Sequence, residues 1–179
     1  MKTLIVLNAL ALTFFSAYSA EPLVQRAEEG NAAAFQAEFK KGATSFEALM
    51  ALHVAISNGN KDIVRFLLEQ GINPAEDFTL SGGSGRQSNA LHHAVIRGDL
   101  AITAMLLAAG GDKAINHKPK HAPNLPLEQA VTYGTPEMVK LLLSYGADSS
   151  KQLSFVFYNR LTLKEFVQNY GRPEIAQLL

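Results

Sequence analysis

Apolar residues recur along most of the chain in short stretches that have the spacing of one helical face. Leu52, Ala55 and Ile56 lie three and four positions apart, and Ile63 to Leu68 forms a second apolar stretch. Gly59 follows the first of these two stretches, and Gly71 follows the second. Glycine ends a helix at low cost because it adopts the left-handed backbone conformation easily. The pattern predicts two short helices, each ending at a glycine.

This arrangement repeats. Four glycines are each followed by a second glycine twelve residues later, and the distance from one pair to the next varies. The pairs are Gly30 with Gly42, Gly59 with Gly71, Gly98 with Gly110, and Gly134 with Gly146. Two helices of this length cannot bury their apolar faces alone, so neighbouring repeat units must stack. We therefore predict an all-α solenoid of about five helix-turn-helix units in a domain over 21–179. The units span 21–43, 50–72, 89–111, 125–147 and 160–179.

Three segments carry a more specific signature. Leu52-His53-Val54-Ala55 and Leu91-His92-His93-Ala94 open two units, and Gly146-Ala147-Asp148 closes another. These segments resemble the ankyrin repeat, although the threonine–proline pair that opens that repeat is missing. The fifth unit departs further, with Lys164 where leucine is expected before Gly171. Divergence is expected of terminal repeats, because they face water on one side.

The resemblance implies roles for several histidines. His53 and His92 hold the repeat's histidine position, where the side chain is expected to hydrogen-bond backbone in the turn between units. The fourth unit has Glu128 at this position. His93 falls on the exposed face of its helix and is a candidate for contact with a partner.

Ankyrin-like arrays generally bind other proteins through a groove and through the tips of the connecting loops, or fingers. The residue before each helix-ending glycine is expected to point into that groove, as is the residue one turn earlier, which includes Val54 and Phe166. Tyrosine and arginine are enriched where proteins bind proteins; the alternative is an ordinary solvent-facing strip. The candidate groove residues are Asn58, His93, Arg97, Gln129, Tyr133 and Tyr170.

Four connecting fingers are expected between the units. They span 43–50, 72–89, 111–124 and 147–160. Loop insertions in such arrays often mark the binding edge, but they are also tolerated because they cost little. Arg86, Lys118 and Lys120 are candidate finger contacts with a partner. Phe155 to Tyr158 either extends that surface or covers the core of the last unit.

Charge and composition exclude several functions. The chain has 16 basic and 16 acidic residues, which argues against a dedicated nucleic-acid binder. We predict no catalytic residues, no cofactor and no metal. His117 and His121 are four residues apart, but Pro119 between them argues against a helix that would join them at one ion. A metal-assisted hydrolase using both histidines is therefore a disfavoured alternative.

The first twenty residues differ from the rest. A short positive start is followed by an apolar stretch from Leu4 to Phe15 and then by small residues, which is the pattern of a secretory signal peptide over 1–19. Cleavage is expected after Ser19 or Ala20. We therefore predict a periplasmic or secreted monomer that binds another protein and has no membrane attachment after cleavage. A narrower alternative is an immunity protein that neutralises a toxin or another effector enzyme.

Overall fold

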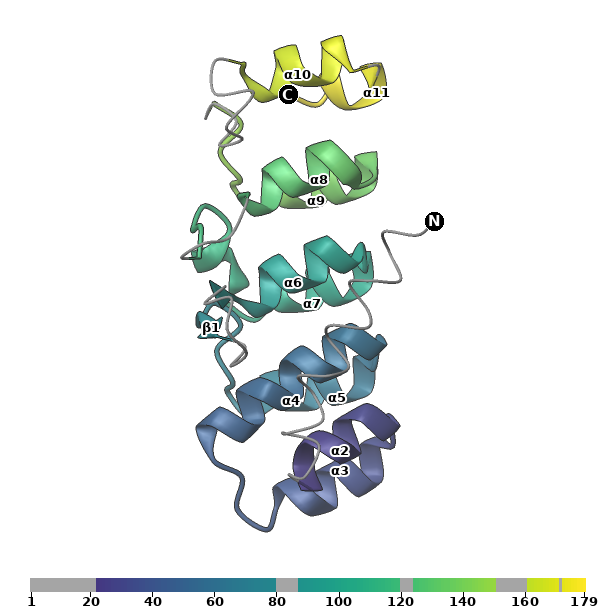
Figure 1. The fold of residues 1–179 in the computed structure, drawn as a ribbon, viewed down its shortest axis with the longest axis vertical. Coiled ribbons are helices and arrows are strands. Elements are labelled where there is room, and N and C mark those ends of the chain that lie inside the picture. Colours follow the sequence, from purple (N-terminus) through teal and green to yellow (C-terminus); the bar gives the residue numbers. More distant parts are fainter. Residues whose placement is uncertain (1–21, 80–86, 120–123, 151–160, 171) are drawn as a thin grey trace. The chain divides into compact units, whose positions relative to one another are not determined.

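The computed structural model describes residues 22–79, 87–119, 124–150, 161–170 and 172–179. These residues are nearly all helical, and their helices follow one another in five pairs (Figure 1). The all-α repeat fold predicted from the glycine spacing is therefore confirmed. The pairs are α2 (Pro22–Glu29) with α3 (Ala32–Phe39), α4 (Ser45–Asn58) with α5 (Lys61–Glu69), α6 (Ala90–Arg97) with α7 (Leu100–Ala108), α8 (Pro126–Tyr133) with α9 (Pro136–Ser144), and α10 (Leu163–Asn169) with α11 (Pro173–Ala176).

The chain forms two compact units. Helices α2 to α5 belong to unit 1, and helices α6 to α11 belong to unit 2 together with residues 73–78. The finger before α6 contains two short strands that pair, β1 (Phe78–Thr79) and β2 (Gln87–Ser88). The next finger contains the 3-10 helix η1 (Gly111–Ala114).

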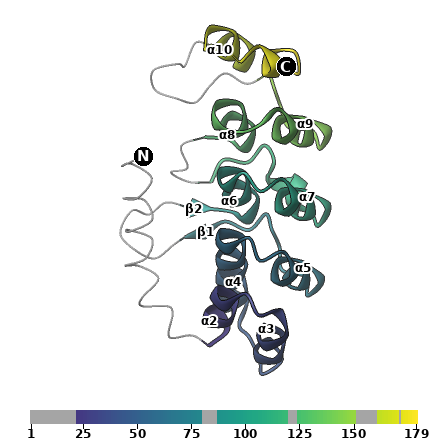
Figure 2. The same cartoon turned by 90° about the vertical axis from the view of Figure 1, so that its right-hand side faces the viewer.

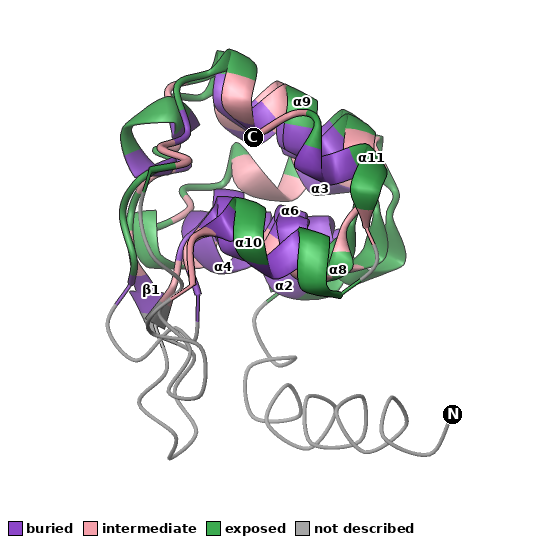
Figure 3. Ribbon diagram, turned by 90° about the horizontal axis from the view of Figure 1, so that it is seen from above, coloured by how far each residue is buried: buried purple, intermediate pink, exposed green. Residues whose placement is uncertain are grey.

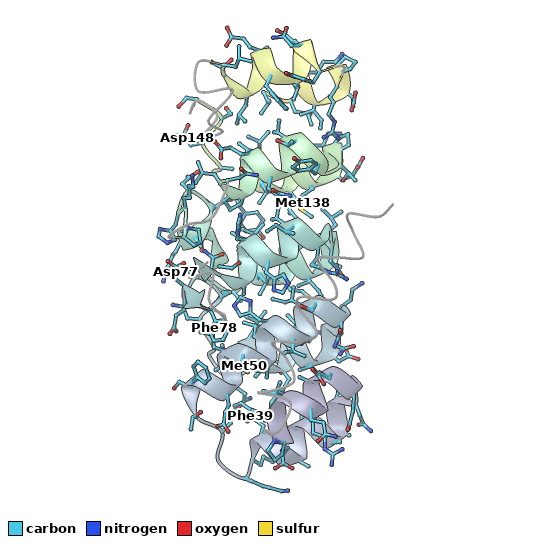
Figure 4. All side chains as sticks on the ribbon, in the orientation of Figure 1. Phe39, Met50, Asp77, Phe78, Met138 and Asp148 are labelled. Carbon is cyan, nitrogen blue, oxygen red and sulfur yellow. The ribbon has the colours of Figure 1, made fainter. Side chains whose placement is uncertain are left out.

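Unit 1 is built around α4, which packs against α2 on one side and α5 on the other. Three phenylalanine rings pack together in this unit, those of the buried Phe35 and of the half-buried Phe39 and Phe66. Phe66 meets Phe35 and Phe39 edge-on, with ring centres 6.0 Å and 5.2 Å apart, and Phe39 is labelled in Figure 4. Edge-to-face contacts of this kind contribute beyond the area that they bury. Phe35 and Phe39 belong to the first repeat, and the structure places both against Phe66 of the second.

Unit 2 stacks three helix pairs. The first helix of each pair packs on the next, α6 on α8 and α8 on α10, and the second helices α7, α9 and α11 contact one another in the same order (Figure 2). Figure 3 shows that the buried sides of the two rows of helices face one another. One continuous apolar core results, and it includes Leu91, Leu107, Val131, Met138, Leu142, Phe166 and Ile175.

Polar caps define the helix starts. Asn31, Asn89, Asp99 and Thr135 each accept a hydrogen bond from the backbone amide three residues later, as N-cap residues do. At the other end, Gly59 and Gly98 adopt φ angles of 71° and 72°, as the sequence predicts. Gly134 is different, because its φ of −86° is not left-handed.

The prediction of a finger over 43–50 was wrong, because α4 already begins at Ser45. The Thr44 side chain accepts from the Glu47 amide at 3.2 Å, and the Glu47 carboxylate accepts from the Thr44 amide at 2.7 Å. This reciprocal capping box fixes a helix start. Ala48 and Leu49 are buried in the added turn, so the second repeat starts earlier than residue 50.

Helix α10 has a polar side that its counterparts lack. Lys164 and Gln168 are exposed, whereas Leu91 and Val95 at the equivalent positions of α6 are buried. A polar outer face is typical of a terminal repeat. The departure from the repeat pattern at Lys164 therefore has a structural explanation.

Candidate functional site

The helix ends in unit 2 carry large exposed side chains at equivalent positions. Arg97 and Tyr133 are the last residues of α6 and α8, and Tyr170 follows the last residue of α10. Tyr133 is 72% exposed, Tyr170 is 53% exposed, and Ile96, next to Arg97, is 49% exposed. Because α8 packs between α6 and α10, these four residues lie along one side of unit 2. We name them the aromatic strip.

Tyr170 of the strip is held in place by local packing. The ring of Tyr170 stacks on Phe166 one turn earlier, with ring centres 4.6 Å apart and planes 29° apart. Phe166 is itself buried in the core. A rigid aromatic side chain loses little conformational entropy when a partner covers it. The strip is thus suited to contact with another surface.

His93 lies beside Arg97 and is uncharged at neutral pH. Burial lowers the pKa of His93 to about 4, and the charges of Arg97 and His92 act in the same direction. The His93 side chain is half-buried rather than fully exposed. Arg97 therefore supplies the positive charge of the strip at neutral pH.

Several other predicted groove residues are less available for binding. Val54 is only 1% exposed, and Phe166 is buried, so the prediction that both face a groove was wrong. Gln129 is half-buried and accepts a hydrogen bond from the Asn124 side chain at 2.8 Å. The remaining candidate, Asn58, is exposed but belongs to unit 1, where its amide lies 3.5 Å from the carbonyl oxygen of Glu28.

The fingers of unit 2 are tied together by side chains. The Oδ2 atom of Asp77 lies 2.7 Å from Nε2 of His117. Asn116 donates to the Gly146 carbonyl at 2.9 Å and accepts from the Asp148 amide at 2.8 Å; Asp77 and Asp148 are labelled on the finger side in Figure 4. Lys118 is exposed beside this network.

Some finger predictions fall on residues that the structure does not describe. Arg86, Lys120, His121 and the segment 155–158 all lie outside the described residues. The predictions made for these residues therefore stay predictions.

A comparison with protein families decides the class of the chain. The model of ankyrin repeats in three copies matches residues 20–118 and 76–153. The chain belongs to the ankyrin-repeat family. Proteins of this family typically act without catalysis, and their repeats mediate binding to other proteins.

Two curated relatives extend over much of this ankyrin-repeat chain. An ankyrin repeat protein of Fowlpox virus (strain NVSL) is 39% identical over 128 residues, which cover 72% of this chain and 26% of the viral protein. A tyrosine-protein kinase of Hydra vulgaris is 28% identical over 137 residues, covering 72% of this chain and 17% of the kinase. The chain therefore spans about a quarter or less of the length of either relative.

The ankyrin histidine position is buried. His53 is 3% exposed and His92 is 1% exposed. Burial lowers the pKa of His92, and the nearby backbone of Asn124 acts in the opposite direction; neither buried ring nitrogen of His92 has a hydrogen-bond partner among the described residues, so the hydrogen bond predicted for it is not found. Glu128 holds the equivalent position in α8, and its carboxylate accepts from the Leu125 amide at 2.7 Å. These side chains are placed to order the connections between repeats rather than to meet a partner.

The described ankyrin repeats were searched for metal-ligating clusters and for membrane-spanning helices. Within residues 22–79, 87–119, 124–150, 161–170 and 172–179, no three His, Cys, Asp or Glu side chains gather closely enough to hold a metal ion. His117 is not on a helix, as Pro119 predicts. Over the same residues, no helix has the length and apolar character needed to cross a membrane.

Sequence reasoning missed Ile96 among the candidate site residues. The sequence does distinguish Ile96. It is a large apolar residue two positions before a helix-ending glycine, and the equivalent residues of two other ankyrin repeats of this chain are the polar Ser57 and Thr132. An apolar residue at this position adds exposed apolar surface next to Arg97.

Proposed function

We propose that this chain is a non-catalytic protein-binding module that acts through the aromatic strip of unit 2. The observation that carries the proposal is the exposure of Ile96, Tyr133 and Tyr170 at successive helix ends, with Arg97 among them. Tyrosine and arginine are enriched among the hot spots of protein interfaces, because they combine large contact areas with polar groups. The ankyrin family supports the same class of function.

The place of action proposed is the periplasm or the outside of the cell. The proposal rests on the charged start, the apolar stretch and the small residues within positions 1–20. Because α2 begins at Pro22, cleavage after Ser19 or Ala20 would leave every described helix intact. Determining the N-terminal sequence of the protein from the periplasm or medium tests this: Ala20 or Glu21 should come first. A first residue of Met1 on the mature protein would sink it.

A narrower form of the proposal makes the partner a toxin or another effector enzyme, with this chain as the immunity protein. A signal-like segment joined to a protein-binding repeat domain favours it, because a toxin from a neighbouring cell would be met outside the cytoplasm. Growth of a deletion strain beside toxin-armed siblings tests the idea. Growth equal to that of the parent strain would rule out immunity.

The binding surface is tested by capturing the partner from a native extract with the tagged protein. Arg97→Ala and Tyr133→Ala should each reduce capture while helicity and melting temperature stay near those of the parent protein. Lys140→Ala on α9 and Tyr145→Ala just after it, both at exposed residues, are matched controls from the second row of helices. Undiminished capture by Arg97→Ala and Tyr133→Ala would move the binding site away from the strip.

A further inference from the structure

Arg97 differs from the other arginines that the structure describes. Arg26 and Arg65 form ion pairs with Glu29 and Asp62, each at 2.7 Å. Arg172 donates to backbone carbonyls and lies near Glu174. Over the described residues, the exposed Arg97 guanidinium forms no ion pair.

The helices that carry the strip do not supply an anion for Arg97. Their sequences contain two acidic residues, Glu128 in α8 and Glu165 in α10. Glu128 is buried and accepts from the Leu125 amide. Glu165 accepts from the Thr162 amide and hydroxyl at 2.8 Å and 2.9 Å, and these hydrogen bonds lower the pKa of Glu165. Both carboxylates are thus engaged at the starts of their own helices.

The strip itself contains no acidic side chain, and Asp99, two residues after Arg97, accepts from the Ile102 amide as the N-cap of α7. Ile96 precedes the arginine, the neutral His93 lies one turn earlier, and Tyr133 ends the neighbouring helix. A guanidinium presents paired donors that match both oxygens of a carboxylate. If a partner's apolar side chains cover Ile96 and Tyr133, they exclude water from the strip. An ion pair between Arg97 and a carboxylate of the partner is then stronger than it would be in water.

We infer that the docked partner segment is a peptide with one carboxylate flanked by apolar side chains, the carboxylate pairing with Arg97 and the apolar side chains packing on Ile96 and Tyr133. This inference rests on the proposed function and specifies the chemistry of the partner. It follows from charge complementarity, because the strip offers a cation without a counter-ion between apolar contacts. A basic segment would place like charges together, which disfavours binding.

A random peptide library displayed on phage is the probe, selected in parallel on the purified protein, on Arg97→Glu and on Lys140→Glu. Both variants change the net charge equally, but Lys140 is on α9. We expect peptides from the parent protein and from Lys140→Glu to share an aspartate or glutamate beside apolar residues. Peptides from Arg97→Glu should replace it with lysine or arginine. Selected peptides that share no acidic residue would overturn the inference.

A second measurement separates this inference from the proposed function. The anisotropy of a selected, labelled peptide should show about 10-fold weaker binding when its acidic residue becomes the amide, and this loss should vanish on Arg97→Ala. If Tyr133→Ala weakens binding but the amide peptide binds as well as the acid, the strip remains the binding site and the carboxylate inference fails. If Tyr133→Ala and Arg97→Ala both leave binding unchanged, the proposed function fails with it.

Discussion

The guanidinium of Arg172 donates a hydrogen bond to the carbonyl of Val131, 2.7 Å away. A second donor of the same side chain reaches the carbonyl of Gly134. Both carbonyls lie at the end of α8. Gly134 is not left-handed there, and its amide bonds only the Ala130 carbonyl, so the carbonyls at this helix end need other donors. A cation at a helix C-terminus also interacts favourably with the helix dipole. Arg172 thus completes the end of α8 and joins the last helix pair to the preceding one.

The same contact recurs in unit 1 with a different residue. Asn60 follows Gly59 as Arg172 follows Gly171, and its side chain donates to the Ala27 carbonyl at 2.8 Å. Ala27 precedes Gly30 by three residues, as Val131 precedes Gly134. Asn60 in unit 1 and Arg172 in unit 2 therefore each hydrogen-bond the end of the first helix of the preceding pair.

Replacing Arg172 with Ala should lower the free energy of unfolding by about 1 to 3 kcal/mol, because two carbonyls lose charge-assisted hydrogen bonds. Urea denaturation measures the change, and hydrogen exchange should show faster exchange in α10 and α11. Arg65→Ala is the matched control, since its exposed ion pair with Asp62 is worth less than about 1 kcal/mol. Equal effects of the two substitutions would contradict the role given to Arg172.

Replacing Gly30 with Ala should destabilise the protein more than replacing Gly59 with Ala. Both glycines have nearly the same left-handed φ, 70° and 71°, but only at Gly30 would a Cβ meet the Asn60 side chain, at 2.9 Å. The shared backbone strain costs about 1 kcal/mol, and displacing Asn60 from the Ala27 carbonyl costs about 1 kcal/mol more.

A double-mutant cycle isolates the crowding at Gly30. In an Asn60→Ala background, Gly30→Ala should cost no more than Gly59→Ala does in the parent protein, as measured by urea denaturation. If the cost of Gly30→Ala is the same in both backgrounds, the contact with Asn60 contributes nothing.

The free energy of unfolding should fall as the pH is lowered through 6.5 toward 4. The pKa of His93 is lowered from 6.5 to about 4 in the folded protein, so in this window the unfolded chain binds a proton that the folded chain does not. Above 6.5 both states are neutral at His93 and the contribution is constant.

The loss from His93 by pH 5 should be about 1 to 2 kcal/mol, and His93→Gln should remove it. His92, whose pKa is also lowered, leaves a remaining slope in the variant. Denaturation between about pH 7.5 and pH 5 avoids the protonation of Glu137 and Glu165, whose pKa values lie below 4.5. The same slope in His93→Gln and the parent protein would refute the assignment.

The repeat fold was predictable because the signals lie within each repeat. Leu52, Ala55 and Ile56 specify one helical face, and Gly59 ends the helix with a backbone angle that glycine adopts easily. The early start of α4 is also specified locally, by the Thr44 and Glu47 capping box, which the prediction of a finger over 43–50 did not use.

Contacts between repeats were harder to predict, because they depend on residues distant in the sequence. Nothing near Arg172 indicates that its partners are Val131 and Gly134. The candidate site was predicted in part for a similar reason. Tyr133 and Tyr170 are exposed as expected, whereas Val54, one turn before the end of α4, is buried. Position within a repeat gives the direction of a side chain but not what neighbouring elements cover.

The central claim is that the aromatic strip is the surface that a partner protein covers, and site-specific photocrosslinking tests it most directly. A benzoylphenylalanine replaces Tyr133, Tyr170 or, as the control, Tyr145, which is 39% exposed after α9. Each protein is irradiated in the native extract, and adducts are resolved by mass. The account predicts partner adducts from positions 133 and 170 and none from position 145. Adducts from position 145 alone, with the partner still captured by all three proteins, would contradict it.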